Sequence, residues 1–309
     1  MTENRSSRWN PRLAGACLAL ALLLPAVAQA RMNLFACEPE WGALAKEIGG
    51  PAVEVFTATT AHQDPHHIQA RPSLIAHMRR ADMLVCTGAD LEIGWLPLLL
   101  RKAHNAKVQR GKPGHFLAAR QVRLLERPAN LDRAEGDIHP LGNPHIQTDP
   151  RNLTRVAQAL AQRLATLDPK EAAGYRQRLQ RFLKRWRESI ARWKRKAAPL
   201  EGTTVVVHHR QWPYLMAWLG MKQVGELEPK PGVPPTAGHL AELKARLQES
   251  PARLIVHAAY MDPAPSHWLS KQTGIPEVTL PFTVGGTPRA RDLFSLFDDT
   301  IDRLLGALR

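Results

Sequence analysis

One stripe of large apolar residues, within residues 171–197, constrains the fold more than any other feature of the chain. Its members recur at spacings of four, three, four, four and three: Tyr175, Leu179, Phe182, Trp186, Ile190 and Trp193. This is the spacing of one face of an α-helix. At 1.5 Å per residue the helix is about 40 Å long, and such a helix can pack against two neighbouring domains.

Short apolar runs alternate with helical patterns on both sides of this helix. The predicted strands are residues 32–37, 53–57, 82–87, 203–207, 253–258 and 277–280, and the predicted helices between them are residues 38–48, 72–80, 153–167, 213–219, 239–247, 265–273 and 289–308. This alternation is typical of parallel α/β sheets, and 309 residues suffice for two cores. We therefore predict an α/β fold of two parallel-sheet lobes, residues 31–168 and 199–309, joined by one long rigid helix in residues 169–198.

The first 30 residues have the pattern of a secretory signal peptide. Arginines at positions 5, 8 and 12 precede an apolar run, and Ala28-Gln29-Ala30 supplies small residues before a cleavage point. A membrane anchor is the alternative, but the run is short and broken by Pro25. We expect cleavage near Ala30 and export to the periplasm. Cys37 and Cys86 then remain, either as a disulfide or as two buried thiols.

Positive charge is concentrated on the long helix. The whole chain has a formal net charge of +14, and the chain from Arg31 keeps about +12 because the leader carries three arginines and one glutamate. The helix combines ten Lys and Arg residues with Glu188 alone. This charge indicates either a nucleic-acid-binding or membrane-binding helix or the solvated face of a structural helix. We favour the structural interpretation and predict no nucleic-acid partner, because no nucleic-acid-binding motif accompanies the charge.

Histidines gather in three separate stretches, each near the end of a predicted strand. They are His62 to Ser73 with Asp64-Pro65-His66-His67, Asn143-Pro144-His145 with Asp149-Pro150, and Val207-His208-His209. Neutral imidazoles are common ligands of zinc, and sites in α/β folds form where strands end. We predict that His66, His145 and His209 bind a metal ion in the cleft between the lobes. His62, His67, His139 and His208 lie near these ligands and are candidates for assisting them.

These motifs resemble those of the substrate-binding proteins of zinc and manganese ABC transporters, the ZnuA/TroA-like family (cluster A-I), whose lobes are bridged by one long helix. The matching residues are Asp64-Pro65-His66 leading to Pro72-Ser73, the strand ending at Gly88 with Asp90 and Glu92, Asn143-Pro144-His145 followed by Asp149-Pro150, and His209 five residues before Tyr214. The resemblance covers nearly the whole chain after the leader. It implies that His66, His145 and His209 are the metal ligands.

The family's usual fourth ligand is an acidic residue near the last strand, and this chain departs from that pattern. Leu280-Pro281-Phe282 stands at the corresponding place, and leucine cannot bind a metal. The alternatives are a water molecule, Glu228, His257 or Asp262, of which Asp262 is our preferred protein ligand.

The resemblance implies a function in metal transport and no enzymatic activity. We expect a monomeric protein that captures a divalent metal and delivers it to a membrane ABC permease. Three imidazoles favour Zn²⁺ over the alternative, Mn²⁺, because manganese usually takes more oxygen ligands. One other interpretation is a secreted zinc hydrolase that uses the same histidines, but the sequence has no His-Glu-x-x-His motif. Another is an adhesin, but the sequence has no lipid-anchor cysteine.

Overall fold

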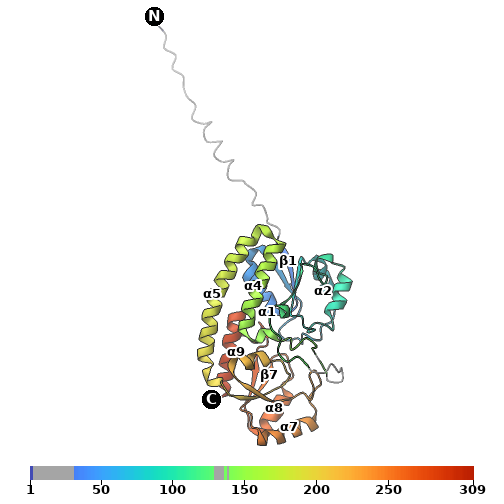
Figure 1. Ribbon diagram of the computed structural model, residues 1–309, viewed down its shortest axis with the longest axis vertical. Helices are drawn as coiled ribbons and strands as arrows, with labels where there is room; N and C mark the ends of the chain where they lie inside the picture. The colour runs from blue at the N-terminus through green and yellow to red at the C-terminus, as the bar shows by residue number, and fades with distance from the viewer. Residues whose placement is uncertain (3–30, 129–135, 138) are drawn as a thin grey trace. The chain divides into compact units, whose positions relative to one another are not determined.

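The computed structural model describes residues 1–2, 31–128, 136–137 and 139–309 (Figure 1). Most of the predicted signal peptide (residues 3–30) and part of the loop before His145 (residues 129–135 and 138) lie outside the described residues. Residues 31–309 form one compact unit. None of the described helices has the length and apolar character needed to cross a membrane.

Two four-stranded sheets, all of whose strand pairs are parallel, form the frame of this unit. The first sheet has the order β2-β1-β3-β4, with strands β1 (Met32–Ala36), β2 (Val53–Thr57), β3 (Met83–Cys86) and β4 (His115–Leu117). The second repeats this order as β6-β5-β7-β8, with strands β5 (Thr204–Val207), β6 (Lys222–Glu226), β7 (Leu254–Ala258) and β8 (Glu277–Leu280). The predicted fold class of two parallel α/β lobes is confirmed.

Helices cover both faces of each sheet, as parallel sheets require. They are α1 (Pro39–Gly49), α2 (Pro72–Arg80), α3 (Leu96–Ala103), α4 (Pro150–Leu167), α5 (Ala172–Lys196), α6 (Pro213–Leu219), α7 (Ala237–Glu249), α8 (Ala264–Thr273) and α9 (Leu293–Ala307). The helix α9 begins with a capping box in which the side chains of Asp292 and Ser295 satisfy each other's backbone N–H groups. The prediction began this helix at residue 289, before that cap.

One hydrophobic core runs through both lobes. Alternate residues of β1 and β5, such as Leu34 and Val207, join the apolar residues of α4, α5 and α9 in this core. The opposite faces of the two sheets have separate cores, one containing Phe35 and Leu84 and the other Val206 and Ile255. Because the shared core is continuous across the lobes, moving one lobe against the other would disturb close packing.

The long helix α5 runs alongside both lobes (Figure 1). Its predicted apolar stripe faces the shared core. Tyr175, Phe182, Trp186 and Trp193 are fully buried. The indole Nε1 of Trp186 donates to Pro150 O at 2.8 Å, and that of Trp193 donates to Asp298 Oδ1 at 2.7 Å. These bonds fix α5 to the start of α4 in the first lobe and to α9 in the second.

Cys37 and Cys86 are joined by a disulfide, which resolves the two alternatives of the sequence. Cys37 directly follows β1 and Cys86 ends β3, and these strands are hydrogen-bonded neighbours. Their Cα atoms lie 4.8 Å apart, within the range of disulfide-linked residues.

Two strands, β4 and β6, and one α-helix, α3, were not predicted from the sequence.

Candidate metal centre

His66 lies in the loop after β2, held in place by the motif that contains it. The Asp64 carboxylate accepts hydrogen bonds from His66 Nδ1 at 2.7 Å and from the backbone N–H of His66 at 3.0 Å. The Trp95 indole donates to the carbonyl of Pro65 at 2.9 Å, which anchors the same loop to the first lobe. Since Nδ1 is engaged by Asp64, the ring directs Nε2 away, and Nε2 is buried without a hydrogen-bond partner.

His145 precedes a short 3-10 helix, Ile146–Thr148, that leads into α4. Asn143 Oδ1 accepts a hydrogen bond from the His145 backbone N–H at 3.0 Å. The same asparagine donates through Nδ2 to the carbonyl of Arg210 at 2.8 Å, and its own carbonyl accepts from the Tyr214 hydroxyl at 2.7 Å. His145 is therefore positioned by a segment of the first lobe that is hydrogen-bonded to the second.

His209 follows β5 and has its own carboxylate partner. Its Nδ1 donates to Glu228 Oε2 at 2.7 Å, and both side chains are buried. Glu228 Oε2 also accepts a hydrogen bond from the Gly232 N–H at 2.8 Å, so the carboxylate is fixed. A carboxylate on Nδ1 sets the tautomer that leaves Nε2 free to bind a metal, which is the usual outer arrangement of histidine ligands. His66 and His209 both have it.

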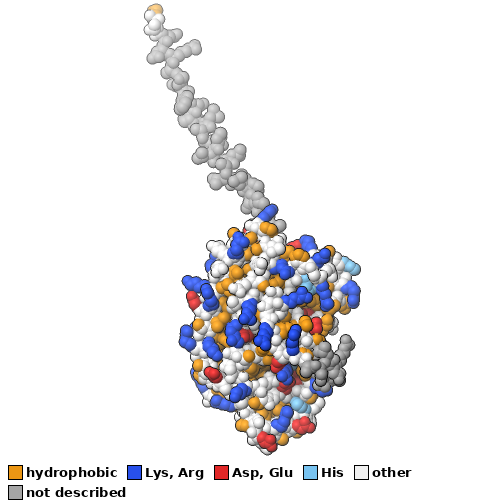
Figure 2. Space-filling view, in the orientation of Figure 1, with side chains coloured by type: hydrophobic (Ala, Val, Ile, Leu, Met, Phe, Trp, Pro, Cys, Tyr) orange, Lys and Arg blue, Asp and Glu red, His pale blue; other side chains and the backbone are white. Residues whose placement is uncertain are grey.

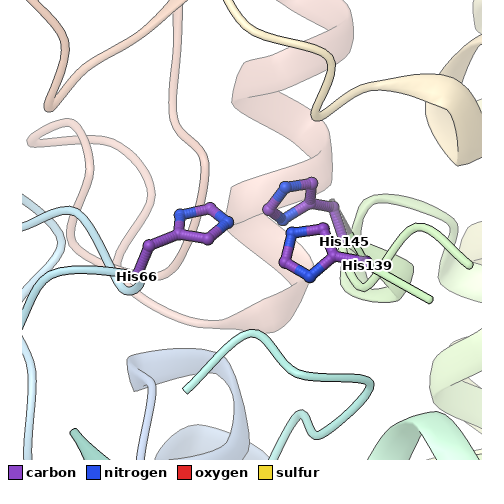
Figure 3. A group of neighbouring side chains, drawn as sticks. All are labelled: His66, His139 and His145. Atoms are coloured by element: carbon purple, nitrogen blue, oxygen red, sulfur yellow. The ribbon is translucent and has the colours of Figure 1, made fainter. Parts of the chain in front are cut away.

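Four imidazoles converge at this place. The ring centroid of His66 lies 5.4 Å from that of His145 and 5.6 Å from that of His209, and the His145 and His209 centroids are 5.6 Å apart. His139 is the fourth, with its centroid 5.3 Å from that of His66. One ring-nitrogen atom from each of His66, His139 and His145 lies within 4.8 Å of the others. Figure 3 shows His66 reaching toward His145 and His139 from the opposite side.

The electrostatics of the cluster favour neutral imidazoles at two positions. Burial, together with the charges of His66 and His209, lowers the pKa of His139 to about 3. Burial and the other three histidines hold the pKa of His145 well below its usual value. A neutral imidazole offers a lone pair to a metal without first losing a proton.

His209 and Asp64 are shifted in the direction that favours their charged forms. Burial opposes the charged form of His209, but the hydrogen bond and charge of Glu228 outweigh it and raise the pKa of His209. Burial likewise opposes ionisation of Asp64, yet the hydrogen bond and charge of His66 lower the pKa of Asp64 to about 2. Asp64 is thus a carboxylate throughout the neutral range, able to balance charge at the cluster.

A cavity of about 400 Å³ adjoins the cluster, and its lining includes His139, His145, His209 and Arg210. It offers a hydrated ion room to approach the imidazoles. A larger cavity of about 910 Å³ shares Glu126 and Arg127 with this one, but none of the four histidines lines it. Of the two cavities, the smaller one is therefore the one that the clustered histidines line.

Asp262, the preferred fourth ligand of the sequence, is not brought into this group. Its side chain is exposed, and Oδ1 accepts a hydrogen bond from the Ala264 N–H at the start of α8. Glu228 is used by His209, and His257 Nε2 lies 2.8 Å from the Thr279 hydroxyl. His139, by contrast, does lie beside His66 and His145. The sequence feature that could have singled out His139 is its position. It is followed by a proline and lies six residues before His145, in a loop rich in turn-forming residues.

Comparison with known proteins finds one protein family along almost the whole chain. The model of the family described as zinc-uptake complex component A, periplasmic, matches residues 35–307. The high-affinity zinc uptake system protein ZnuA of Yersinia pestis is 22% identical over 237 residues, which cover 70% of this chain and 72% of that protein. The manganese ABC transporter substrate-binding lipoprotein PsaA of Streptococcus pneumoniae is 21% identical over 249 residues, covering 78% and 76%.

A solved structure shares the fold. The crystal structure of ZnuA superposes with a TM-score of 0.75 at 21% sequence identity, covering 91% of this chain and 100% of that one. The two-lobed arrangement with a long helix is therefore common to both.

Proposed function

The chain belongs to the family of zinc-uptake complex component A, periplasmic, and from this premise we propose that it captures a divalent transition metal outside the cytoplasm and delivers it to a membrane ABC permease. The family consists of solute-binding proteins and not enzymes, so the hydrolase alternative is not supported. The observation that carries the proposal is the convergence of buried imidazoles from both lobes on one point.

The ligands we propose are His66, His145 and His209, with His139 as the fourth in place of Asp262. Two arguments support this set. His66 and His209 each have a carboxylate on Nδ1, and His66 Nε2 and His145 Nδ1 are buried without hydrogen-bond partners. A buried polar atom left without a partner costs about 1–3 kcal/mol, which a bound metal would offset.

The metal we propose is zinc. Four nitrogen ligands suit a tetrahedral Zn²⁺ site, whereas Mn²⁺ is favoured by carboxylate, carbonyl and water oxygens. Manganese is the alternative because relatives of similar identity are named for it.

In the proposed cycle the protein acts as a periplasmic monomer after cleavage near Ala30, with its lobes at residues 31–168 and 199–309. The shared core supports small lobe movements on metal loading rather than wide opening.

A competitive zinc titration of the metal-stripped chain from Arg31 tests the ligand set. We expect one tight site, weakened at least about 100-fold by His66→Ala, His145→Ala or His209→Ala, because the loss of a direct ligand exceeds the 10–100-fold typical of an outer partner. His267→Ala is the matched control, since that side chain is exposed and pairs only with Glu277. Parent-like affinity in all three variants would contradict the assignment, and a parent that binds neither Zn²⁺ nor Mn²⁺ tightly would contradict the proposed function.

A further inference from the structure

The outer side of α5 carries exposed cations that form no ion pair with a carboxylate of the described residues. We define this basic face by the exposed residues Arg176, Arg181, Lys184, Arg187 and Arg195. We propose that the basic face is an electrostatic docking surface for an anionic phospholipid membrane.

The basic face differs from the rest of the helix in its pairing. Toward the edges of α5, the cations Arg185, Arg192 and Lys196 form ion pairs with Glu47, Asp298 and Asp302. Among the described residues, no carboxylate lies within ion-pair distance of the five residues of the basic face. Glu188, the only acidic residue of α5, is exposed and follows Lys184 by four residues, so it lies on the same side as the basic face and offsets one of its five charges. The positive charges of the basic face are therefore available to attract an anionic partner outside the molecule.

The geometry of the basic face suits a flat partner. Its residues follow one side of a 25-residue helix, about 37 Å long at 1.5 Å per residue, opposite the buried stripe that contains Trp186. Figure 2 shows Lys and Arg side chains along the edge of the molecule that α5 forms in Figure 1. Because the opposite side is packed into the core, α5 can present only this long, shallow surface.

The absence of apolar anchors favours lipid over a protein partner. The large apolar side chains exposed among the described residues are Met1, Ile93, Leu98, Leu141, Val233 and Trp268, and none of them lies on α5. Stable protein interfaces are centred on buried aromatic or aliphatic anchors. Attraction to anionic head groups needs only several cations near the surface, and it weakens as salt rises.

Membrane docking would add a second activity to this chain, separate from metal binding. A protein held at the membrane surface searches for an integral membrane partner in two dimensions. The basic face contains none of the four clustered histidines, so the failure of one proposal does not imply the failure of the other.

Co-sedimentation with vesicles tests the proposal. The chain from Arg31 is mixed with vesicles of phosphatidylcholine alone or with about one third phosphatidylglycerol. The test variant combines Arg176→Gln, Lys184→Gln, Arg187→Gln and Arg195→Gln. The matched control combines Arg101→Gln, Lys102→Gln, Lys112→Gln and Lys271→Gln, which removes the same charge from exposed positions on other elements. Zinc titration of both variants checks that they are folded.

We expect the parent and the control to bind the anionic vesicles, with binding lost as salt rises, and the test variant to bind about tenfold or more weakly. Equal weakening in both variants would show that net charge alone is responsible and would overturn the proposal. The proposal would also be overturned if the parent binds vesicles with and without phosphatidylglycerol equally. A third contrary result would be that duplex DNA at the same salt displaces the parent from the vesicles and that this displacement depends on the same four residues.

Discussion

Glu228 and His209 form a buried pair in which Nδ1 of the imidazole donates to Oε2 of the carboxylate at 2.7 Å. The pair orients the one clustered histidine that comes from the second lobe. It also raises the pKa of His209, so a metal bound by this imidazole would compete with a proton.

With His209 as a ligand, we expect the pair to make zinc affinity depend on pH in a defined direction. Only neutral His209 binds metal, so affinity falls as the pH falls through the raised pKa of His209. In Glu228→Gln the carboxylate charge that raises this pKa is gone, and the pH at which affinity declines moves lower. At pH 8 we expect Glu228→Gln to bind zinc about 10–100-fold more weakly than the parent, because the carboxylate that orients His209 has been replaced by a weaker partner. Zinc titrations of parent and variant between pH 5 and pH 8 measure both effects. An unchanged pH profile in Glu228→Gln would contradict this role of the pair.

His139 and Asp262 give opposite expectations as the fourth ligand. His139→Ala removes a clustered imidazole, so we expect zinc affinity to fall at least about tenfold and the preference for zinc over manganese to narrow. Asp262→Ala should leave both quantities unchanged, because Asp262 is exposed and its carboxylate accepts from the Ala264 N–H. Competition titrations with Zn²⁺ and Mn²⁺ distinguish the two. A large effect of Asp262→Ala with none for His139→Ala would restore the acidic ligand.

Glu40 makes folding stability depend on pH. Its carboxylate accepts a hydrogen bond from the Thr283 hydroxyl of the second lobe, and burial raises the pKa of Glu40 to about 7. Since the unfolded value is lower, the folded chain holds its proton longer, and stability declines as the pH rises from about 4.5 to 7. Glu40→Gln removes the Glu40 part of that decline, while the raised pKa values of Glu38 and Glu92 keep their own parts. We therefore expect the stability of the variant, compared with the parent, to be about 2–3 kcal/mol more favourable at pH 8 than at pH 4. Denaturant unfolding at both pH values is the measurement, and an equal effect at both would count against the assignment.

Trp193 is expected to contribute heavily to the joining of the lobes. It is fully buried, its ring centroid lies 5.1 Å from those of both Trp186 and Phe297, and its indole bonds to Asp298. Trp193→Ala should lower the free energy of unfolding by about 3–5 kcal/mol. Arg187→Ala, an exposed change on the same helix, should alter it by less than about 0.5 kcal/mol. Urea unfolding curves compare the two, and similar values for both would show that α5 is not held by this contact.

The elements with strong local patterns were predictable, and the weaker ones were not. The strands at residues 53–57 and 277–280 and the helices at 72–80 and 213–219 agree residue for residue with the structure. By contrast, β6 contains Gly225 beside a register irregularity in its pairing with β5, and β4 has only three residues. Such strands exist because a neighbouring strand supplies their hydrogen bonds, and this information lies outside their own sequence.

The sequence by itself determined the parallel α/β pattern, the long amphipathic helix and the three histidine motifs, because each depends on the spacing of residues near one another in the chain. Only the tertiary structure decided that Cys37 and Cys86 are bonded, that Asp262 faces solvent, and that His139 lies beside His66 and His145. The physical reason is distance along the chain. His66 and His209 are separated by 143 positions, and their rings lie 5.6 Å apart because both lobes end their central strands at one cleft and share one core.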